Sequence, residues 1–212
     1  MRWIDLTHPV SPGMPVIPGD ASPEVVDAQT LDRDGCSVQE IRCANHVGTH
    51  VDAPLHFLAD GRSVDRISLH KLVGSAALLD FSNLEAGSRI RWRELESALT
   101  NAGNPDKVLI HTGWDRHFGS PQYFEDFPAL DSEAAEGLAG QGIDLLGVDT
   151  PSPSPLEDPG QKIHKVLLTA EVVIVENLCG LARLGSLAEV FILPLPIQGA
   201  SGAPCRAVGR SL

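Results

Sequence analysis

The sequence is poor in cysteine, aromatic and basic residues, and it has no long apolar run. Its four cysteines (Cys36, Cys43, Cys179 and Cys205) form no C-x-x-C pair, which argues against a thiolate zinc site and a disulfide framework. We expect these cysteines to be buried and unreactive. No stretch approaches the roughly 18 apolar residues of a membrane-spanning helix, and Asp5 stands where a signal peptide would have its apolar segment. These absences predict a cytoplasmic protein.

Positive charge is scarce as well. The 16 basic residues are outnumbered by 28 acidic ones, which gives a net charge of -12. The resulting field repels phosphate backbones and anionic bilayers, so nucleic acid and membrane surfaces are poor candidate partners, and we expect a small-molecule substrate. A phosphate-binding loop is also missing, because the Gly48-Thr49 pair lacks the lysine and flanking glycines of a P-loop.

Proline and glycine, by contrast, are more frequent than a helix bundle tolerates, with 16 and 20 residues. A hydrophobic fraction of 42% over 212 residues suffices for one sizeable core, so we expect a single domain over residues 1–212. Apolar and β-branched runs predict strands over residues 3–6, 37–44, 107–110, 143–148, 172–175, 190–195 and 205–208, with a further apolar run over 72–81. Helical spacing predicts helices over residues 90–99, 131–138 with Asp131 as N-cap, and 163–170. Proline-rich loops are predicted over 7–20 and 152–160, and the whole pattern indicates a mixed α/β domain with more sheet than helix.

One segment concentrates groups that bind metals: His46, His50, Asp52 and His56 lie within eleven residues. Each offers a nitrogen or oxygen to a hard or borderline divalent ion, and packing does not explain such a cluster. The first two histidines have the spacing of a zincin helix, but no glutamate follows His46 and Pro54 would interrupt the helix, so we reject that interpretation. If the segment is extended instead, His50 and Asp52 point to the same side and can chelate together.

His56 follows the stiffening proline, and a neutral imidazole with a pKa near 6.5 suits proton transfer near neutral pH. We assign it to general acid/base work, with direct ligation as the alternative. Downstream, His164 begins a short helix, and Glu176 ends an apolar strand, where a carboxylate is costly unless it is paired or metal-bound. Taken alone, each of these two residues is also explained as a structural or solvated residue at the end of an element.

The pattern H-x-G-T-H-x-D-x-P-x-H-F, from His46 to Phe57, resembles the signature of the metal-dependent cyclase/kynurenine formamidase family, which includes isatin hydrolase. Similarity extends over most of the chain: residues 15–20, 146–151, 164, 176–178 and 199–208. The resemblance implies a swivelling β/β/α fold that assembles as a homo-oligomer, a dimer or tetramer.

The resemblance also implies a ligand set. His46, His50 and Asp52 would bind one divalent metal, and Asp52, His164 and Glu176 would serve a second position or complete the first. His56 matches the proton donor and acceptor of the family. Zinc or manganese is the expected metal, with one or two ions per subunit.

Two features bear on the substrate. Ile17 stands where kynurenine formamidases generally have tryptophan, so we expect it to contact the substrate through apolar surface but to offer no aromatic ring on which the substrate could stack. The Gly48-Thr49-His50 triplet of the signature also differs from the Gly-Ala-His of the narrower formamidase group. Aromatic residues gather over 114–127 in a chain that is only 5% aromatic, which predicts either a satellite hydrophobic cluster or a lid over an apolar substrate.

We therefore expect metal-assisted hydrolysis of a small amide, lactam or ester, and specifically of C–N bonds other than peptide bonds. The alternatives are a metal-dependent cyclase or dehydratase that acts on a small carbonyl substrate, and a non-catalytic metal-binding protein with a closed ligand shell.

Overall fold

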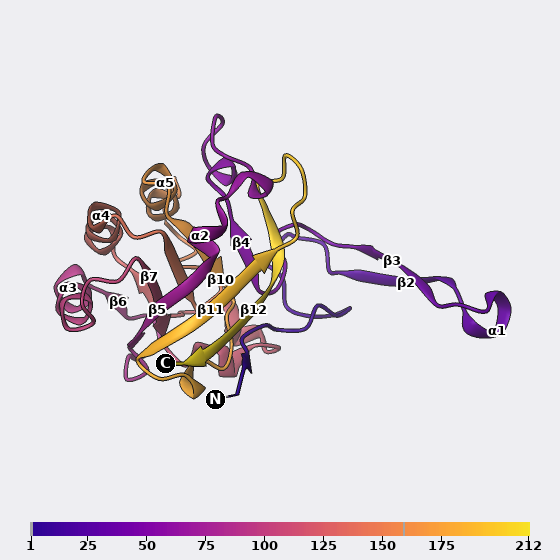
Figure 1. Ribbon diagram of the computed structural model, residues 1–212, viewed down its shortest axis with the longest axis horizontal. Coiled ribbons are helices and arrows are strands. Elements are labelled where there is room, and N and C mark those ends of the chain that lie inside the picture. The colour runs from indigo at the N-terminus through magenta and orange to yellow at the C-terminus, as the bar shows by residue number, and fades with distance from the viewer. Residues whose placement is uncertain (1, 159) are drawn as a thin grey trace.

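A closed sheet of seven strands forms the centre of the computed structural model, which describes residues 2–158 and 160–212 (Figure 1). The strand order is β12-β11-β5-β7-β9-β10-β4, and β4 pairs back with β12, while β1 adds to β12 as an eighth strand. The strands of this sheet are β1 (Ile4–Asp5), β4 (His50–Asp52), β5 (Val73–Asp80), β7 (Lys107–His111), β9 (Leu145–Val148), β10 (Val173–Glu176), β11 (Leu187–Pro194) and β12 (Gly202–Ser211).

The four adjacent strands β5, β7, β9 and β10 run parallel to one another. Each of the three connections from one of these strands to the next contains a helix. The helices are α3 (Trp92–Asn101), α4 (Ser132–Gln141) and α5 (Lys162–Thr169). Figure 1 shows all three on the same side of the sheet. Strands covered on both faces are apolar throughout rather than alternating, and β7 is accordingly buried along its whole length.

Alternate residues of these strands separate two cores. Leu109 packs with Val51 and Val175 in the interior of the closed sheet. Its neighbours Val108 and Ile110 pack with the buried faces of the helices. Because side chains in a strand alternate between faces, one strand supplies both cores, and the mixed α/β fold with more strand than helix follows from this arrangement.

The three predicted helices are confirmed, with their ends displaced by up to three residues. α3 begins at Trp92 because the preceding residues form β6 (Arg89–Ile90), which pairs with β8 (Ala129–Leu130). The Asp131 side chain accepts a hydrogen bond from the Ala134 N–H at 2.7 Å, as expected of an N-cap. The helix that follows Asp131, α4, extends three residues past its predicted end, and Gly142, with a φ of 70°, is its C-cap.

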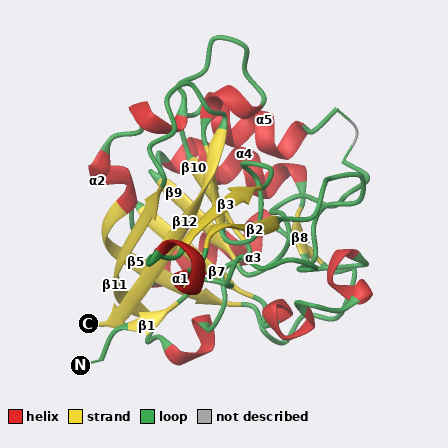
Figure 2. Cartoon of the chain, turned by 90° about the vertical axis from the view of Figure 1, so that its right-hand side faces the viewer, coloured by secondary structure: helices red, strands yellow, loops and turns green. Residues whose placement is uncertain are grey.

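A hairpin of β2 (Glu24–Gln29) and β3 (Val38–Arg42) projects from the body and bears the single-turn helix α1 (Leu31–Asp34) at its tip (Figures 1 and 2). The strand predicted over 37–44 is confirmed, but its partner strand lies in a segment for which no strand was predicted. Cys36 and Cys43 lie on this hairpin and are exposed, whereas Cys205 is buried. The expectation that all four cysteines are buried is therefore wrong, because an arm with solvent on both faces has no interior.

The remaining elements are short. They are the helix α2 (Leu69–Leu72) and the 3-10 helices η1 (Pro54–His56), η2 (Val64–Arg66), η3 (Trp114–His117), η4 (Pro121–Phe124) and η5 (Leu181–Arg183). The two predicted proline loops contain no helix, and one of their prolines, Pro159, lies outside the described residues. Within the described residues, no helix is both long enough and apolar enough to cross a membrane.

A candidate metal centre on the closing strand

The strand β4 closes the sheet and carries part of the site. Its three residues pair with β10 on one side and with β12 on the other. Val51, at its centre, is fully buried in the inner core, so His50 and Asp52 project from the opposite face, toward α5. The extended conformation predicted for this segment is thus confirmed. Glu176 of β10 lies directly opposite His50 in the register, which places both side chains on the same face.

His164 reaches this face from α5. It lies on the buried side of the helix with Leu167 and Leu168, at the spacing that places residues on one helical face. The His164 Nε2 atom lies 3.1 Å from Glu176 Oε1, and its Nδ1 atom lies 2.9 Å from the hydroxyl of Ser154. The helix therefore aims one ring nitrogen at the carboxylate while the serine holds the other.

His46 joins from the loop before β4, which turns at Gly48 with a φ of 59°. Its Nδ1 atom lies 2.7 Å from Asp52 Oδ1, and its Nε2 atom lies 3.0 Å from the Ser201 hydroxyl. The neighbouring strand β12 leaves room for the ring because it has Gly202 at this point. A Cβ atom there would lie 2.5 Å from His46 Cε1, far inside contact distance.

The five predicted ligands therefore meet in one place. His50 Nε2 lies 3.3 Å from Asp52 Oδ1 and 3.3 Å from Glu176 Oε2, and His164 Nε2 lies 3.8 Å from Asp52 Oδ2. They form two groups whose ligand atoms lie within 4.8 Å of one another: His46, His50 and Asp52, and Asp52, His164 and Glu176. Asp52 belongs to both groups, as a carboxylate shared between two metal positions would.

The pKa values of several side chains in this cluster are shifted far from their ordinary values. Burial alone would lower the pKa of His50, but the hydrogen bond to Asp52 and the charges of Asp52 and Glu176 raise it to about 9. Burial opposes ionisation of Asp52, yet the bonds from His46 and His50 hold the pKa of that carboxyl well below its usual range. For His164, the carboxylates of Glu176 and Asp52 outweigh burial and raise the pKa. Two buried carboxylates thus favour nearby positive charge, and they do so here by raising the pKa of the imidazoles beside them.

A divalent ion fits this chemistry. Among the described residues, Asp52 Oδ2 is buried and accepts no hydrogen bond, an arrangement that is costly unless a cation is bound there. Imidazole and carboxylate donors without thiolate suit zinc, manganese, iron or cobalt. The ligand roles of these residues remain a prediction that the geometry supports.

His56 occupies a different position. It ends the 3-10 helix η1, and its ring stacks on that of His46 with centroids 3.8 Å apart and planes inclined by 24°. It belongs to neither group of candidate ligands. Burial, with the neighbouring histidines, lowers the pKa of His56 to about 4, although the charge of Asp52 opposes this shift. The imidazole is therefore uncharged near neutral pH, and in the metal-free protein it is a weaker base than a free imidazole.

A cavity of about 360 Å³ opens over the cluster, within the size range of small-molecule sites. The predicted ligands His46, His50, His164 and Glu176 line it, as does His56. Ile17 reaches its wall from the first proline loop, and its contact with a substrate stays a prediction.

Sequence reasoning missed other residues of this cavity, among them Asp20, Asn45, Ser154 and Gln161. Of these, only Ser154 lies in a sequence pattern from which a place in the site could have been predicted. It lies ten residues before His164 and alternates with Ser152 in a proline loop, a pattern that presents two hydroxyl groups on one side. The amide of Asn45 instead donates to Ser201 and to the Gly202 carbonyl, so it anchors the start of the histidine segment.

The aromatic segment forms a satellite cluster, one of the two predicted arrangements. Trp114, Tyr123 and Phe127 are buried together, with Phe118 and Phe124 packed against them. The Tyr123 hydroxyl donates to Asn177 Oδ1 at 2.8 Å, so the cluster supports the residue after Glu176. None of the five aromatic residues lines the cavity over the candidate metal ligands.

Comparison with known proteins gives a family match over part of the chain and individual relatives that match nearly all of it. The family model described as putative cyclase matches residues 4–155. A kynurenine formamidase of Bacillus cereus is 33% identical over 212 residues, which is 100% of this chain and 98% of that protein, and one of Bacillus cytotoxicus is 32% identical with the same coverage. Among solved structures, isatin hydrolase A from Ralstonia solanacearum has a TM-score of 0.88 and 25% identity, with 98% of this chain and 91% of that chain covered. Isatin hydrolase A from Labrenzia aggregata, bound to benzyl benzoate, has the same TM-score and identity, with 98% and 93% covered.

Proposed function

Because this chain belongs to the cyclase family, we propose that it is a metal-dependent hydrolase that acts on a small amide, lactam or ester, with C–N bonds outside peptides as its main target. The matching relatives include formamidases and isatin hydrolases, and structural neighbours are described as metal-dependent hydrolases. The observation that carries the proposal is the convergence of three imidazoles and two carboxylates, four of which line one cavity. A structural metal site would instead be closed by its ligands.

His46, His50 and Asp52 would hold one divalent ion, and Asp52, His164 and Glu176 would hold a second or complete the first. Two features support this assignment: both groups contain Asp52, and the unpaired oxygen of Asp52 faces His164 at 3.8 Å. Zinc and manganese are our candidates, with one or two ions per subunit. When bound, such an ion lowers the pKa of a water molecule toward about 7 and polarises the carbonyl of the substrate.

The protein's own groups would do the remaining work. His56, uncharged and beside His46, would take the proton from the attacking water and return it to the leaving nitrogen or oxygen. No other protein group among the described residues is hydrogen-bonded to its ring, so both ring nitrogens remain available to water and substrate. Ile17 would press an apolar surface against the substrate and help to exclude water from the reacting carbonyl.

The test uses protein stripped of metal with a chelator and then reloaded with Mn²⁺ or Zn²⁺. Formanilide, isatin and phenyl acetate are offered as substrates, and product formation is followed by absorbance. We expect turnover that requires the metal and that is lost in Asp52→Asn, which removes the carboxylate common to both ligand groups. Protein that binds metal but hydrolyses none of these compounds would overturn the proposal and favour the non-catalytic alternative.

We also propose that the chain assembles as a dimer or tetramer in the cytoplasm. The projecting β2–β3 hairpin supports assembly, because Val26, Leu31 and Ile41 on it are 57%, 69% and 67% exposed. A two-stranded hairpin is marginally stable alone in water, and contact with a second copy would cover these side chains. Light scattering on the purified protein checks this proposal, and a monomer at micromolar concentration would contradict it.

A further inference from the structure

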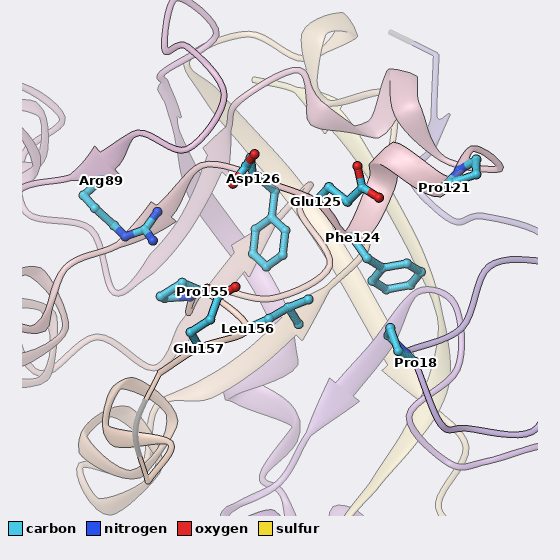
Figure 3. A pocket seen from close by; sticks show the side chains of 10 residues that line it. Pro18, Arg89, Pro121, Phe124, Glu125, Asp126, Pro155, Leu156 and Glu157 are labelled. Carbon is cyan, nitrogen blue, oxygen red and sulfur yellow. The ribbon is translucent and has the colours of Figure 1, made fainter.

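A second cavity, of about 480 Å³, lies beside the first. Its lining comes from four separate segments: the first proline loop at Pro18, the strand β6 at Arg89, the 3-10 helix η4 with the residues that follow it, and the second proline loop at Pro155 and Leu156. Figure 3 shows the side chains of Pro18, Phe124 and Leu156 gathered at one end of this cavity, with Arg89 at the other end. We call this space the outer pocket and the cavity over the candidate ligands the metal pocket.

The two pockets adjoin each other and share part of one wall. Pro155 and Leu156 line both of them, and the adjacent residues Ile17 and Pro18 line one each. The outer pocket is therefore next to the place where a carbonyl group bound at the candidate ligands would lie, with Leu156 between the two. The metal pocket alone, at about 360 Å³, holds only the reacting end of a longer substrate.

Two large apolar side chains of the outer pocket are not fully buried in a core of the fold. Leu156 is 41% exposed, although it is a large aliphatic residue. Phe124 is only partly buried, because one part of the ring packs against Tyr123, with centroids 5.3 Å apart, and it also lines the pocket. Exposed apolar side chains that gather in a concave site, rather than being scattered, are typical of ligand-binding surfaces.

The charges around the pocket limit which ligands it accepts. Three carboxylates line it, from Glu125, Asp126 and Glu157, against one guanidinium, from Arg89. That guanidinium already donates through Nη1 to the backbone carbonyl of Gly87 at 3.0 Å. A negatively charged group would thus meet net repulsion here, whereas an apolar group without negative charge would not.

We propose that the outer pocket is a substrate subsite, which binds an apolar arm without negative charge attached beyond the bond that is cleaved. The inference rests on the proposed hydrolase function, since it assumes that the reacting carbonyl lies in the metal pocket. It names the substrate class more narrowly: an elongated amide or ester whose far end is an aryl or alkyl group. Phe124 and Leu156 are the residues that recognise this arm.

The experiment compares three substrates of the metal-loaded protein: formanilide, 4-benzylformanilide and its 4-(4-carboxybenzyl) analogue. We expect kcat/KM for the benzyl compound to exceed that for formanilide by at least about tenfold, since a single methylene in an apolar pocket can contribute this much. The carboxylated analogue should lose most of that advantage. Equal kcat/KM for the short and long compounds, or a preference for the carboxylated one, would overturn the subsite.

Substitutions in the outer pocket test whether its side chains cause the preference for the benzyl compound. Phe124→Ala should reduce the ratio of the benzyl to the formanilide kcat/KM by about tenfold. Because Phe124 also packs on Tyr123, Leu156→Asn is the second variant, at a side chain that supports no core. The matched control is Leu193→Ala, a leucine that is 47% exposed on β11 and lines neither pocket, and this variant should keep the wild-type ratio. A wild-type ratio in both pocket variants would contradict the proposal.

A binding measurement separates this inference from the function on which it rests. Calorimetric titration with 4-benzylaniline and with aniline requires no turnover, and we expect the benzyl compound to bind more tightly to wild type than to Leu156→Asn. If none of the three substrates is hydrolysed but this difference is present, the proposed function fails and the pocket stands as a binding site. If formanilide is hydrolysed and the difference is absent, the subsite fails alone.

Discussion

Replacing Ser154 by alanine tests whether the protein holds His164 in place for a metal. The hydroxyl of Ser154 lies 2.9 Å from His164 Nδ1, and the two residues are only 2% and 5% exposed. A histidine that binds a metal through one ring nitrogen is usually fixed by a hydrogen bond at the other. In Ser154→Ala the Nδ1 atom loses that partner in a place where water has little access.

The size of the effect follows from this burial. A buried donor left without an acceptor costs about 1–3 kcal/mol. The same bond is present before metal binds, so part of this cost appears as a lower free energy of unfolding. The part that appears in metal affinity comes from an imidazole that is no longer held toward Glu176. Loss of such supporting bonds raises metal dissociation constants by about 10- to 100-fold, and we expect a value in that range.

The assay is calorimetric titration of the metal-free protein with Mn²⁺ and with Zn²⁺, together with thermal unfolding of the metal-free form. Ser152→Ala is the matched control. Its hydroxyl lies 3.2 Å from that of Ser154 and accepts from the Ser154 N–H, but it does not contact His164. We expect the control to bind metal with near wild-type affinity. Unchanged metal affinity in Ser154→Ala, with only its thermal stability lowered, would refute the reasoning.

Three further predictions follow from the same site and its surroundings. His56→Ala should retain its metal and lose turnover by about 100-fold or more, as measured by elemental analysis and steady-state kinetics, and loss of metal would make His56 a ligand instead. Glu176→Gln should weaken metal binding because it removes a buried charge 3.1 Å from His164, and unchanged metal content with an unchanged rate would exclude Glu176 from the site. Burial raises the pKa of Asp149 from 3.8 to about 6, despite the bonds that it accepts from Thr112. The folded state therefore binds this proton more tightly than the unfolded state, and the contribution of Asp149 to the free energy of unfolding is full below about pH 4 and falls as the pH rises to about 6. Denaturant titrations at pH 4 and pH 7 should show that the free energy of unfolding of wild type, relative to that of Asp149→Asn, falls by on the order of 2 kcal/mol between the two pH values; an unchanged difference would show that Asp149 is not responsible.

The elements that could be predicted from the sequence are those whose periodicity reflects local burial. The strand at 107–110 is buried along its length and the helix at 163–170 is buried on one face, so their apolar patterns are clear. The strand at 24–29 went unpredicted because it is exposed on both faces, and no alternation of apolar and polar residues marks it. The same exposure made the prediction for Cys36 and Cys43 wrong.

The candidate site divides in a similar way. His46, His50, Asp52 and His56 could be found because one short segment contains them, and packing alone does not call for such a composition. His164 and Glu176 have ordinary local explanations, and only the resemblance to a known family connected them to the first segment. The outer pocket could not be predicted at all, since it is assembled from four segments far apart in the sequence, around Pro18, Arg89, Phe124 and Leu156, and none of them has a distinctive local pattern.

The position of the site in the fold also links metal binding to closure of the sheet. β4 is only three residues long, yet it is the strand that joins β10 to β12 and so completes the ring. Its backbone bonds on both sides favour closure, while the buried carboxylates of Asp52 and Glu176 oppose it unless positive charge lies between them. In the metal-free chain these carboxylates raise the pKa of His50 and of His164 and so favour a proton on each ring, and a divalent ion would supply positive charge at the same place. A ligand that binds only the closed form stabilises that form, so the residues that bind the metal would also hold the last strand of the sheet in place.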